Sequence, residues 1–279
     1  MRLLHSSTEG SDGFALLIVL WVLVLIALIV GYVTSTGRSE IQVAENIAAN
    51  AAASAAADGA VYRAIFALMD PRQDRRLPVD GSIQEMRIGR SAISLRLFDE
   101  NDRINPNLAS VRLLEGLLQA VGTPAQTAAD LADGITQWVG TARTLRPPDA
   151  LAAEYRAAGL DYAPPETPLE SLEELARVRG MTTQMLTQLR PHLTLFGGRE
   201  PNSTTTDPIV ATAVRYASQA NAAISGSTPV FSGIGQGALI IRVLTSAQGP
   251  GRAVAHSTVI VRISSFETRG HAILSWQSN

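Results

Sequence analysis

The side chains that most often carry out catalysis or bind metals are sparse and scattered in this sequence. It contains no cysteine, which excludes disulfides, iron–sulfur clusters, zinc held by cysteine and a cysteine nucleophile. The four histidines lie far apart along the chain, at His5, His192, His256 and His271. A histidine-rich metal site is therefore not expected, and no nucleophile motif, acid–base pair or phosphate-binding loop stands out. The sequence predicts a protein that is not an enzyme.

An oxygen-rich run at residues 99–102, Asp-Glu-Asn-Asp, is the local cluster that most suggests a ligand, because such runs bind calcium. The spacing does not match a calcium loop of about twelve residues, and the glycine expected at its sixth position is missing. We favour the alternative, a turn followed by helix caps, in which Asn107 and Ser110 accept free N–H groups at a helix start. Asn202, which follows Pro201, is interpreted in the same way. Both asparagines are therefore predicted to be structural caps.

Residues 169–189 predict two short helices joined by a tight turn at Gly180. This arrangement resembles helix-hairpin-helix and SAM-like modules, some of which bind DNA through backbone amides that face phosphate. Such a hairpin usually has two glycines separated by one apolar residue, whereas this one has a single glycine and no lysine nearby. The whole chain also has a formal net charge of −2. A membrane-anchored nucleic-acid-binding protein is therefore the alternative function, and no nucleic acid is expected as a partner.

Residues 14–33 form an unbroken apolar segment, and no charged residue lies between Asp12 and Arg38. About 20 apolar residues in a helix span the hydrocarbon core of a bilayer, which is roughly 30 Å thick. The apolar part of a secretory signal peptide is shorter, about 7–15 residues, and is followed by a cleavage site with small residues. We therefore predict a transmembrane helix over residues 14–33.

The helical pattern continues beyond this apolar segment. Residues 38–68 contain no proline and are rich in alanine, which is a strong helix former. A single helix over residues 14–69, ending before Pro71, would be about 80 Å long. Small residues permit close packing between helices in lipid, so Gly31 and the alanine-rich face are the expected packing surface.

The rest of the chain predicts an α+β head. Alternating apolar residues indicate strands at residues 83–88, 92–98, 239–245, 258–264 and 271–276, with residues 254–257 as an extension of the fourth. Helices are expected at residues 111–121, 124–139, 148–158, 169–178, 183–189 and 207–219. The predicted divisions are a leader at 1–13, the helix at 14–69, a β part at 70–104, an inserted α-domain at 105–200 and a C-terminal α/β part at 201–279.

The pair Gly13-Phe14 stands between a short polar leader and the apolar segment, and this pattern resembles the N-terminus of type IV pilins and pseudopilins. The resemblance implies that a prepilin peptidase cuts between Gly13 and Phe14 and that the new terminal Phe14 is methylated. Most pilin-like proteins have glutamate at the fifth mature position, where it pairs with the terminal amine of a neighbouring subunit. This chain has Ile18 there, which favours a special place in a filament, such as the tip.

The order of motifs over nearly the whole chain is similar to the K-type minor pseudopilins of type II secretion, also called general secretion pathway protein K. The resemblance rests on the Gly13-Phe14 leader, Ile18, the segments at residues 99–107 and 169–181, and the Pro201-Asn202 element. It implies an α+β fold in which a long N-terminal transmembrane helix supports a pseudopilin α/β scaffold with an inserted all-α, SAM-like domain.

The same resemblance implies a non-catalytic tip subunit of the periplasmic pseudopilus, which helps to initiate assembly and to export folded proteins. The implied partners are the I-type, J-type and H-type minor pseudopilins, prepilin peptidase as the processing enzyme, and inner-membrane lipid. The implied location is the cell inner membrane, crossed once, with the C-terminal head in the periplasm.

Members of this family often bind calcium through aspartates around a segment centred on a tryptophan. Here that segment is residues 135–141, with Gln137 and Gly140 near Trp138 where carboxylates would be expected. Calcium is possible for the family, but the ligand pattern is largely missing. We therefore assign no metal ligands and expect no cofactor.

Overall fold

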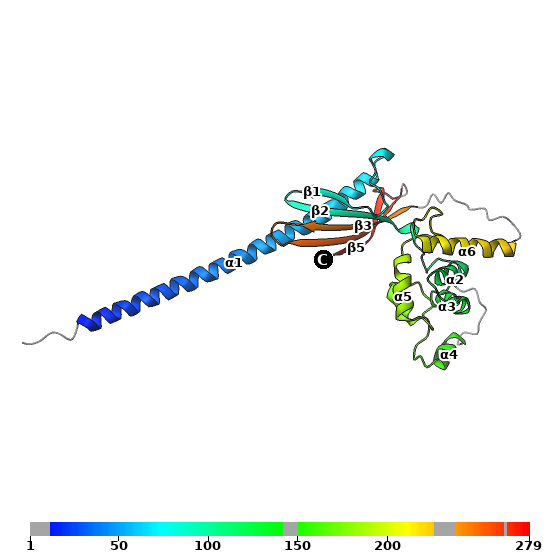
Figure 1. Cartoon of the computed structure of the whole chain (residues 1–279), viewed down its shortest axis with the longest axis horizontal. Coiled ribbons are helices and arrows are strands. Elements are labelled where there is room, and N and C mark those ends of the chain that lie inside the picture. Colours follow the sequence, from blue (N-terminus) through cyan, green and yellow to red (C-terminus); the bar gives the residue numbers. More distant parts are fainter. Residues whose placement is uncertain (1–11, 142–149, 226–237, 265–266) are drawn as a thin grey trace, which may run out of the picture.

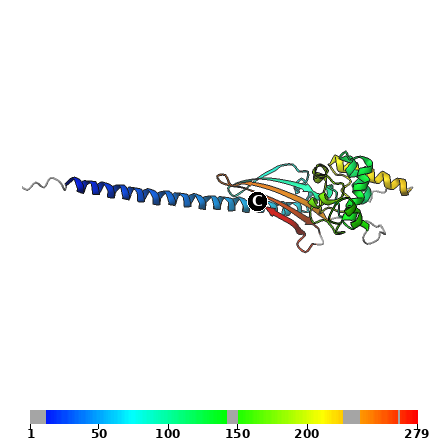
Figure 2. The same cartoon turned by 90° about the horizontal axis from the view of Figure 1, so that it is seen from below.

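A long N-terminal helix is the dominant feature of the computed structural model, which describes residues 12–141, 150–225, 238–264 and 267–279. Helix α1 (Asp12–Leu68) is 57 residues long and projects far beyond the head (Figures 1 and 2). It matches the helix expected at residues 14–69, because no proline interrupts the sequence before Pro71. The 3-10 turn η1 (Gln73–Arg75) follows it. Residues 1–11 of the predicted leader lie outside the described residues.

The head contains an antiparallel sheet whose five strands are neighbours in sequence order: β1 (Gln84–Ile88), β2 (Ser91–Asp99), β3 (Leu239–Gln248), β4 (Val254–Ile263) and β5 (His271–Ser278). All five expected strands are confirmed, including the extension of the fourth. The turns at Gly89 and Gly251 have φ values of 58° and 72°, which glycine adopts without strain. The pairing of β4 with β5 is irregular at one point, where the register shifts between Ile260 and Val261 of β4.

The second half of α1 packs on one face of this sheet. Its contacts are chiefly with β2, β3 and β4 (Figure 1). Near the end of the helix the buried side chains are large: Val61, Ile65 and Leu68 meet Leu95, Leu97, Ile241, Val243, Val259 and Val261. Nearer the membrane segment only alanines are buried, namely Ala53, Ala56, Ala57 and Ala60. Burial of this apolar stripe holds the helix to the sheet, and each fully buried large side chain contributes about 1.5–3 kcal/mol.

An α-helical domain is inserted between β2 and β3. Its elements are η2 (Glu100–Asp102), α2 (Val111–Ala120), α3 (Ala125–Trp138), α4 (Ala150–Ala157), η3 (Leu172–Arg177), α5 (Thr183–Leu189), η4 (Arg190–His192) and α6 (Pro208–Ser225). They enclose a core of their own, separate from the sheet core. Figure 1 shows this domain at the end of the sheet farthest from the protruding part of α1. The helix expected at residues 169–178 is instead the short 3-10 helix η3.

The structure corrects the predicted end of the inserted domain at residue 200. Helix α6, assigned from sequence to the C-terminal α/β part, packs along α2 and contributes Val210, Ala213 and Ala217 to the core of the α-domain. The two helices approach closely at Gly116, where a Cβ would lie 2.9 Å from the carbonyl oxygen of Ala213. The α-domain therefore continues to the end of α6, after which β3, β4 and β5 complete the sheet.

Candidate assembly site

The protruding part of α1 is apolar and uncovered. Residues Phe14–Tyr32 have a mean hydropathy of 3.2, and none of this segment is buried by the rest of the chain. Nineteen helical residues rise by about 28 Å, close to the thickness of the hydrocarbon core. An amphipathic helix of a soluble head would instead bury one face. This segment therefore fits a single-pass membrane anchor.

The residues predicted to act in processing and packing lie at the start of α1 and along this uncovered segment. Gly13 and Phe14 are in the first turn of α1, and Ile18 follows one turn later. Phe14 and Ile18 are exposed, and a Cβ built at Gly31 would have no neighbour within 4 Å. The fold of the described chain therefore does not depend on the side chains of Phe14 and Ile18 or on the lack of one at Gly31. Their roles in cleavage and helix packing stay predictions.

The alanine-rich face of α1 borders a groove of about 780 Å³ between the helix and the turns of the two hairpins. The helix side is lined mainly by Ala48, Ala49, Ala52, Ala55 and Ala56, and the turn side includes Ile88, Gly89, Pro250 and Gly251. Small side chains on both walls leave backbone close to the surface, where another helix can approach. The predicted packing face is therefore accessible on the head as well as in the membrane segment.

An apolar patch that the sequence pattern did not reveal lies beside β5. It is made of Tyr62, Phe66, Met69, Ile273 and Trp276 and is called here the aromatic patch. Phe66 is 80% exposed, and Tyr62, Met69 and Ile273 are also exposed around the half-buried Trp276. The rings of Tyr62 and Trp276 lie 5.6 Å apart. The patch exists because α1 covers β2 to β4 and makes only slight contact with β5. Clustered exposed aromatic residues are typical of protein-binding surfaces.

Strand β5 is also an edge of the sheet, and it differs from the opposite edge, β1. Strand β1 has five residues, and two of them, Glu85 and Arg87, are charged. Strand β5 has eight residues, HAILSWQS, with no aspartate, glutamate, lysine or arginine. Charged and short edge strands prevent unwanted pairing, whereas a long uncharged edge is suited to pairing with another chain. The β5 edge and the aromatic patch together form the candidate assembly surface of the head.

A buried carboxylate, Glu100, joins the α-domain to the sheet. Glu100 follows directly after β2 and is 1% exposed. Its Oε1 forms an ion pair with Arg242 of β3, without the alignment of a hydrogen bond, and its Oε2 accepts a hydrogen bond from the hydroxyl of Thr194. These contacts link three segments that are distant in sequence. They fix the direction in which the α-domain leaves the sheet.

Asn202 lies at the same junction and is not a helix cap, contrary to the sequence prediction. Its Nδ2 donates to Asp99 Oδ2 at 3.0 Å and to Asp102 Oδ1 at 2.9 Å, and its backbone N–H donates to the carbonyl of Asn101 at 2.8 Å. The amide therefore fastens the segment before α6 to the acidic run at residues 99–102. This acidic run is a turn with amide partners, as the favoured alternative predicted.

Asn107 likewise has a tertiary role rather than a capping role. Its Nδ2 donates to the carbonyl of Leu169 at 3.1 Å, and its Oδ1 accepts the N–H of Leu169 at 2.7 Å. The cap of α2 is Ser110, whose hydroxyl accepts the N–H of Leu113 at 3.2 Å. Only the second of the two predicted caps for this helix is therefore confirmed.

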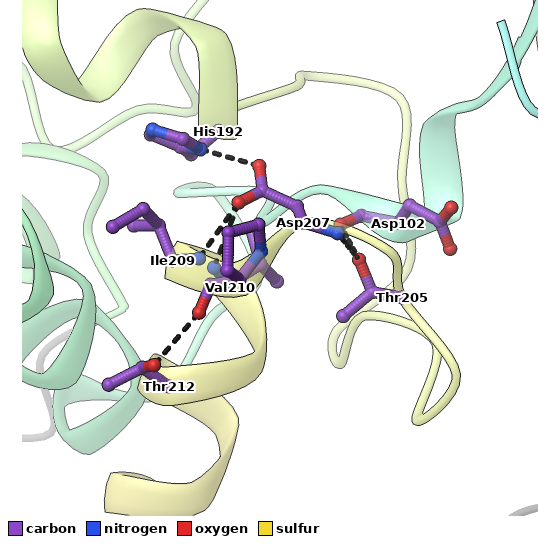
Figure 3. Close-up of polar contacts among 8 residues, drawn as sticks. Asp102, His192, Thr205, Asp207, Ile209, Val210 and Thr212 are labelled. Carbon is purple, nitrogen blue, oxygen red and sulfur yellow. Dashed lines mark hydrogen bonds and ion pairs between the residues drawn. The ribbon is translucent and has the colours of Figure 1, made fainter.

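The cap of α6 is Asp207, which the sequence analysis did not identify (Figure 3). Its Oδ1 accepts the N–H groups of Ile209 at 2.9 Å and of Val210 at 3.3 Å, and its Oδ2 lies 2.5 Å from Nδ1 of His192. The sequence Asp-Pro at the start of the helix is the signal that would have revealed it. His192 belongs to η4, so this contact ties α6 to the segment that follows α5.

Burial shifts the pKa values of two groups at this junction. The pKa of Asp99 is raised, mainly by burial and also by the nearby Asp102, although hydrogen bonds from Asn101 and Asn202 oppose the change. The pKa of Arg103 is lowered by burial and by Arg242, against the attraction of nearby carboxylates. The junction therefore holds its charges in a partly desolvated environment.

The raised pKa of Asp99 makes the stability of the head depend on pH. A carboxyl group with a raised folded pKa binds its proton more tightly when folded, so its contribution is complete below pH 3.8 and is lost as the pH rises through the folded value. We expect Asp99→Asn to remove this decline, measured as the difference in unfolding free energy from the unsubstituted chain between about pH 3 and pH 7.

Asp80 provides a control with the opposite sign, because hydrogen bonds from Ser82 lower its pKa. Its contribution is present above pH 3.8 and is lost as the pH falls through the folded value. Asp80→Asn should therefore reduce the fall in unfolding free energy as the pH is lowered below about 4. Equal pH profiles for the Asp99 variant and the unsubstituted chain would contradict the effect of burial at Asp99.

The described residues do not offer a calcium site of the expected kind. Within them, no group of three or more His, Asp or Glu side chains is arranged to hold a metal ion. Near Trp138 the carboxylate of Glu174 accepts the N–H groups of Glu170 and Ser171, at 2.9 Å and 2.8 Å, so it already serves as a capping group. This donor set does not fit a calcium ion.

The segment that resembles a helix-hairpin-helix carries arginines that are paired with carboxylates. Arg190 forms an ion pair with Glu173, and Arg179 forms one with Glu154 at 3.6 Å. Gly180 makes the turn with a φ of 87°. Paired arginines leave little positive charge for a phosphate backbone. Nothing in this geometry favours the nucleic-acid alternative.

Two comparisons bear on the family. Residues 92–198 match the family model described as type II secretion system (T2SS), protein K. A chain in the crystal structure of the GspK-GspI-GspJ complex from the type 2 secretion system of enterotoxigenic Escherichia coli shares the fold, with a TM-score of 0.56 and 15% identity. That match covers 88% of this chain and 99% of the other. No curated protein matches the sequence.

The two matches differ in how much of the chain they cover and in what they show. At 15% identity the structural match shows the α+β pseudopilin fold alone, over most of the chain. The family match covers β2 and the greater part of the inserted α-domain, including two of the segments quoted from the sequence, residues 99–107 and 169–181. Together they confirm the resemblance of this chain to protein K of type II secretion, a minor pseudopilin.

Proposed function

We propose that this chain works as a non-catalytic minor pseudopilin at the tip of a type II secretion pseudopilus, where it helps to initiate assembly. The observation that supports this most is the continuity of α1, which runs without a break from an exposed apolar segment into the core of the head. Because the helix is continuous, the depth of its apolar segment in the membrane determines where the head lies. It places the head at a fixed height above the bilayer.

The placement at the tip is supported by Ile18 and by the position of the α-domain. A subunit with isoleucine at this position has no carboxylate to pair with the terminal amine of a neighbouring subunit. The inserted domain lies at the far end of the head from the protruding helix (Figures 1 and 2). Its bulk there would block a further subunit stacked above. In this proposal the α1 segment Phe14–Tyr32 crosses the inner membrane and the head lies in the periplasm.

The proposed partners are the I-type, J-type and H-type minor pseudopilins. The solved structure with the same fold belongs to a complex named for GspK, GspI and GspJ. In this chain the groove along the alanine-rich face of α1 is suited to a partner helix, and the aromatic patch is suited to a partner head. In this proposal the groove binds the helix of one partner and the aromatic patch binds the head of a partner.

Cleavage by prepilin peptidase tests the proposed function. We expect the full chain, expressed in membranes with active peptidase, to lose residues 1–13 and to gain one methyl group on Phe14. The measurement is the intact mass after purification, with a catalytically inactive peptidase as the reference. Gly13→Leu should prevent the cut, because a side chain at this position hinders the close approach that glycine allows.

Gly10→Leu is the matched control, since it makes the same change within the leader but away from the predicted bond. It should be processed like the unsubstituted chain. An unchanged mass with active peptidase would overturn the pseudopilin function.

A further inference from the structure

The face of the sheet that α1 covers changes in character along the helix. Small side chains dominate the row of paired residues nearest the protruding part of α1, which is Ala255, Ala247 and Ile93. The next row is polar on two of its three strands and consists of Ser257, Thr245 and Leu95. Branched side chains make up the row after that, namely Val259, Val243 and Leu97. The sheet therefore passes from small to polar to large side chains with distance from the membrane segment.

Helix α1 changes in the same way and at the same level. Before Asp58 its buried residues are alanines, whereas after Ala60 they include Val61, Ile65 and Leu68. Hydrophobic stabilisation grows with the apolar area removed from water, and an alanine side chain contributes a single methyl group. The part of α1 that leads to the membrane segment is therefore held to the sheet more weakly than the part that follows Gly59.

The boundary between the two parts lies at Asp58 and Gly59. Asp58 Oδ1 accepts a hydrogen bond from the hydroxyl of Ser257 at 3.0 Å, which fixes the helix to the polar row. Gly59 follows directly, and a Cβ built there would lie 3.6 Å from Ile88 Cδ1, an ordinary contact distance. Packing therefore does not require a glycine at this position. Glycine is among the weakest helix formers, so the helix bends here at the lowest cost.

The weakly held part of α1 also has space beside it. The groove of about 780 Å³ lies between its alanines and the turns at Gly89 and Gly251. Gly249, next to Ala53, has no side chain, and a Cβ built on it would lie only 3.1 Å from the Cβ of Ala53. The turn therefore meets the helix through backbone, and no side chain of Gly249 interlocks with α1.

We propose that Asp58-Gly59 is a hinge at which the preceding part of α1 swings away from the sheet while the following part stays docked. The closed form is the one in the structure, and the open form is a minor population in equilibrium with it. Opening widens the groove and changes the tilt of the head on its membrane segment. The hinge is a property of the chain itself and does not depend on the proposed assembly function.

Thiol labelling of the full chain in detergent micelles tests the hinge, because the chain has no cysteine of its own. Ala53→Cys and Ala64→Cys are matched variants, since both alanines are fully buried and they lie on opposite sides of Gly59. We expect a water-soluble maleimide to label position 53 at least about tenfold faster than the measured global unfolding of that variant allows, with little dependence on urea at low concentration. Position 64 should react only as fast as global unfolding allows.

Gly59→Ala combined with Ala67→Gly tests the position of the hinge, because the pair moves the glycine and keeps the composition of the helix. We expect labelling at position 53 to slow about fivefold, the equilibrium factor for the difference in helix propensity between glycine and alanine. Labelling at position 64 should change less than about twofold. If position 53 reacts no faster than global unfolding allows, or if moving the glycine leaves its rate unchanged, the proposal is overturned.

Discussion

Replacing Glu100 with alanine is expected to lower the unfolding free energy of the head by about 3–5 kcal/mol. Glu100 is buried and is the ion-pair partner of Arg242, whose side chain is itself mostly buried. Without the carboxylate, the guanidinium keeps its charge in a desolvated place, and the hydroxyl of Thr194 loses its acceptor. The cost comes from the partners left behind more than from the attraction that is removed.

Denaturant unfolding of the full chain in detergent, followed by tryptophan fluorescence, measures this loss. The matched control is Glu267→Ala, which breaks the more exposed ion pair with Arg262 and should cost at most about 1 kcal/mol. Arg242→Ala added to Glu100→Ala should recover part of the stability, because it removes the uncompensated charge. If Glu100→Ala and Glu267→Ala have equal effects, the buried junction is not what holds the α-domain to the sheet.

Placing arginine at Phe66 is expected to reduce the capture of partner pseudopilin heads by about 30-fold. Phe66 is the most exposed large side chain of the aromatic patch, so nothing in its own chain explains an aromatic residue there. Central aromatic residues of interfaces contribute about 2 kcal/mol or more, and each 1.4 kcal/mol is about a tenfold change in affinity. A charge in the same place also carries a desolvation cost into any complex.

The measurement is co-purification of the full chain with I-type and J-type partners at graded partner concentrations. Ile83→Arg is the control, because Ile83 is exposed just before β1, at the opposite edge of the sheet from the patch. Both variants should keep the unfolding free energy within about 0.5 kcal/mol, since neither side chain is buried. If Ile83→Arg weakens capture and Phe66→Arg does not, the partner head binds the β1 edge instead of the patch.

The head has two main hydrophobic cores, one between α1 and the sheet and one inside the α-domain. Among the residues that the structure describes, the sheet core and the α-domain core share no buried apolar residue. Polar contacts around Glu100 and Asn202 therefore carry much of the connection between the two parts. Such contacts are directional, so losing one changes the orientation of the α-domain as well as its stability.

The sequence alone determined the elements whose signals are local. The α1 helix follows from a proline-free run of apolar and alanine residues, and its membrane segment follows from the absence of charge between Asp12 and Arg38. The strands follow from alternating apolar residues, and the insertion of helices between them follows from the order of these patterns. These features depend on neighbours a few residues away, which the sequence displays directly.

Tertiary structure decided the roles that depend on distant partners. Asparagine is a residue type that often caps helices, yet the hydrogen-bond partners of Asn107 and Asn202 are 62 and about 100 residues away along the chain. Helix α6 shows its apolar face in the sequence, but only packing on α2 reveals which core that face joins. The aromatic patch arises because α1 packs over β2 to β4 and makes only slight contact with β5. Burial and hydrogen-bond satisfaction are properties of the whole fold, and no window of sequence contains them.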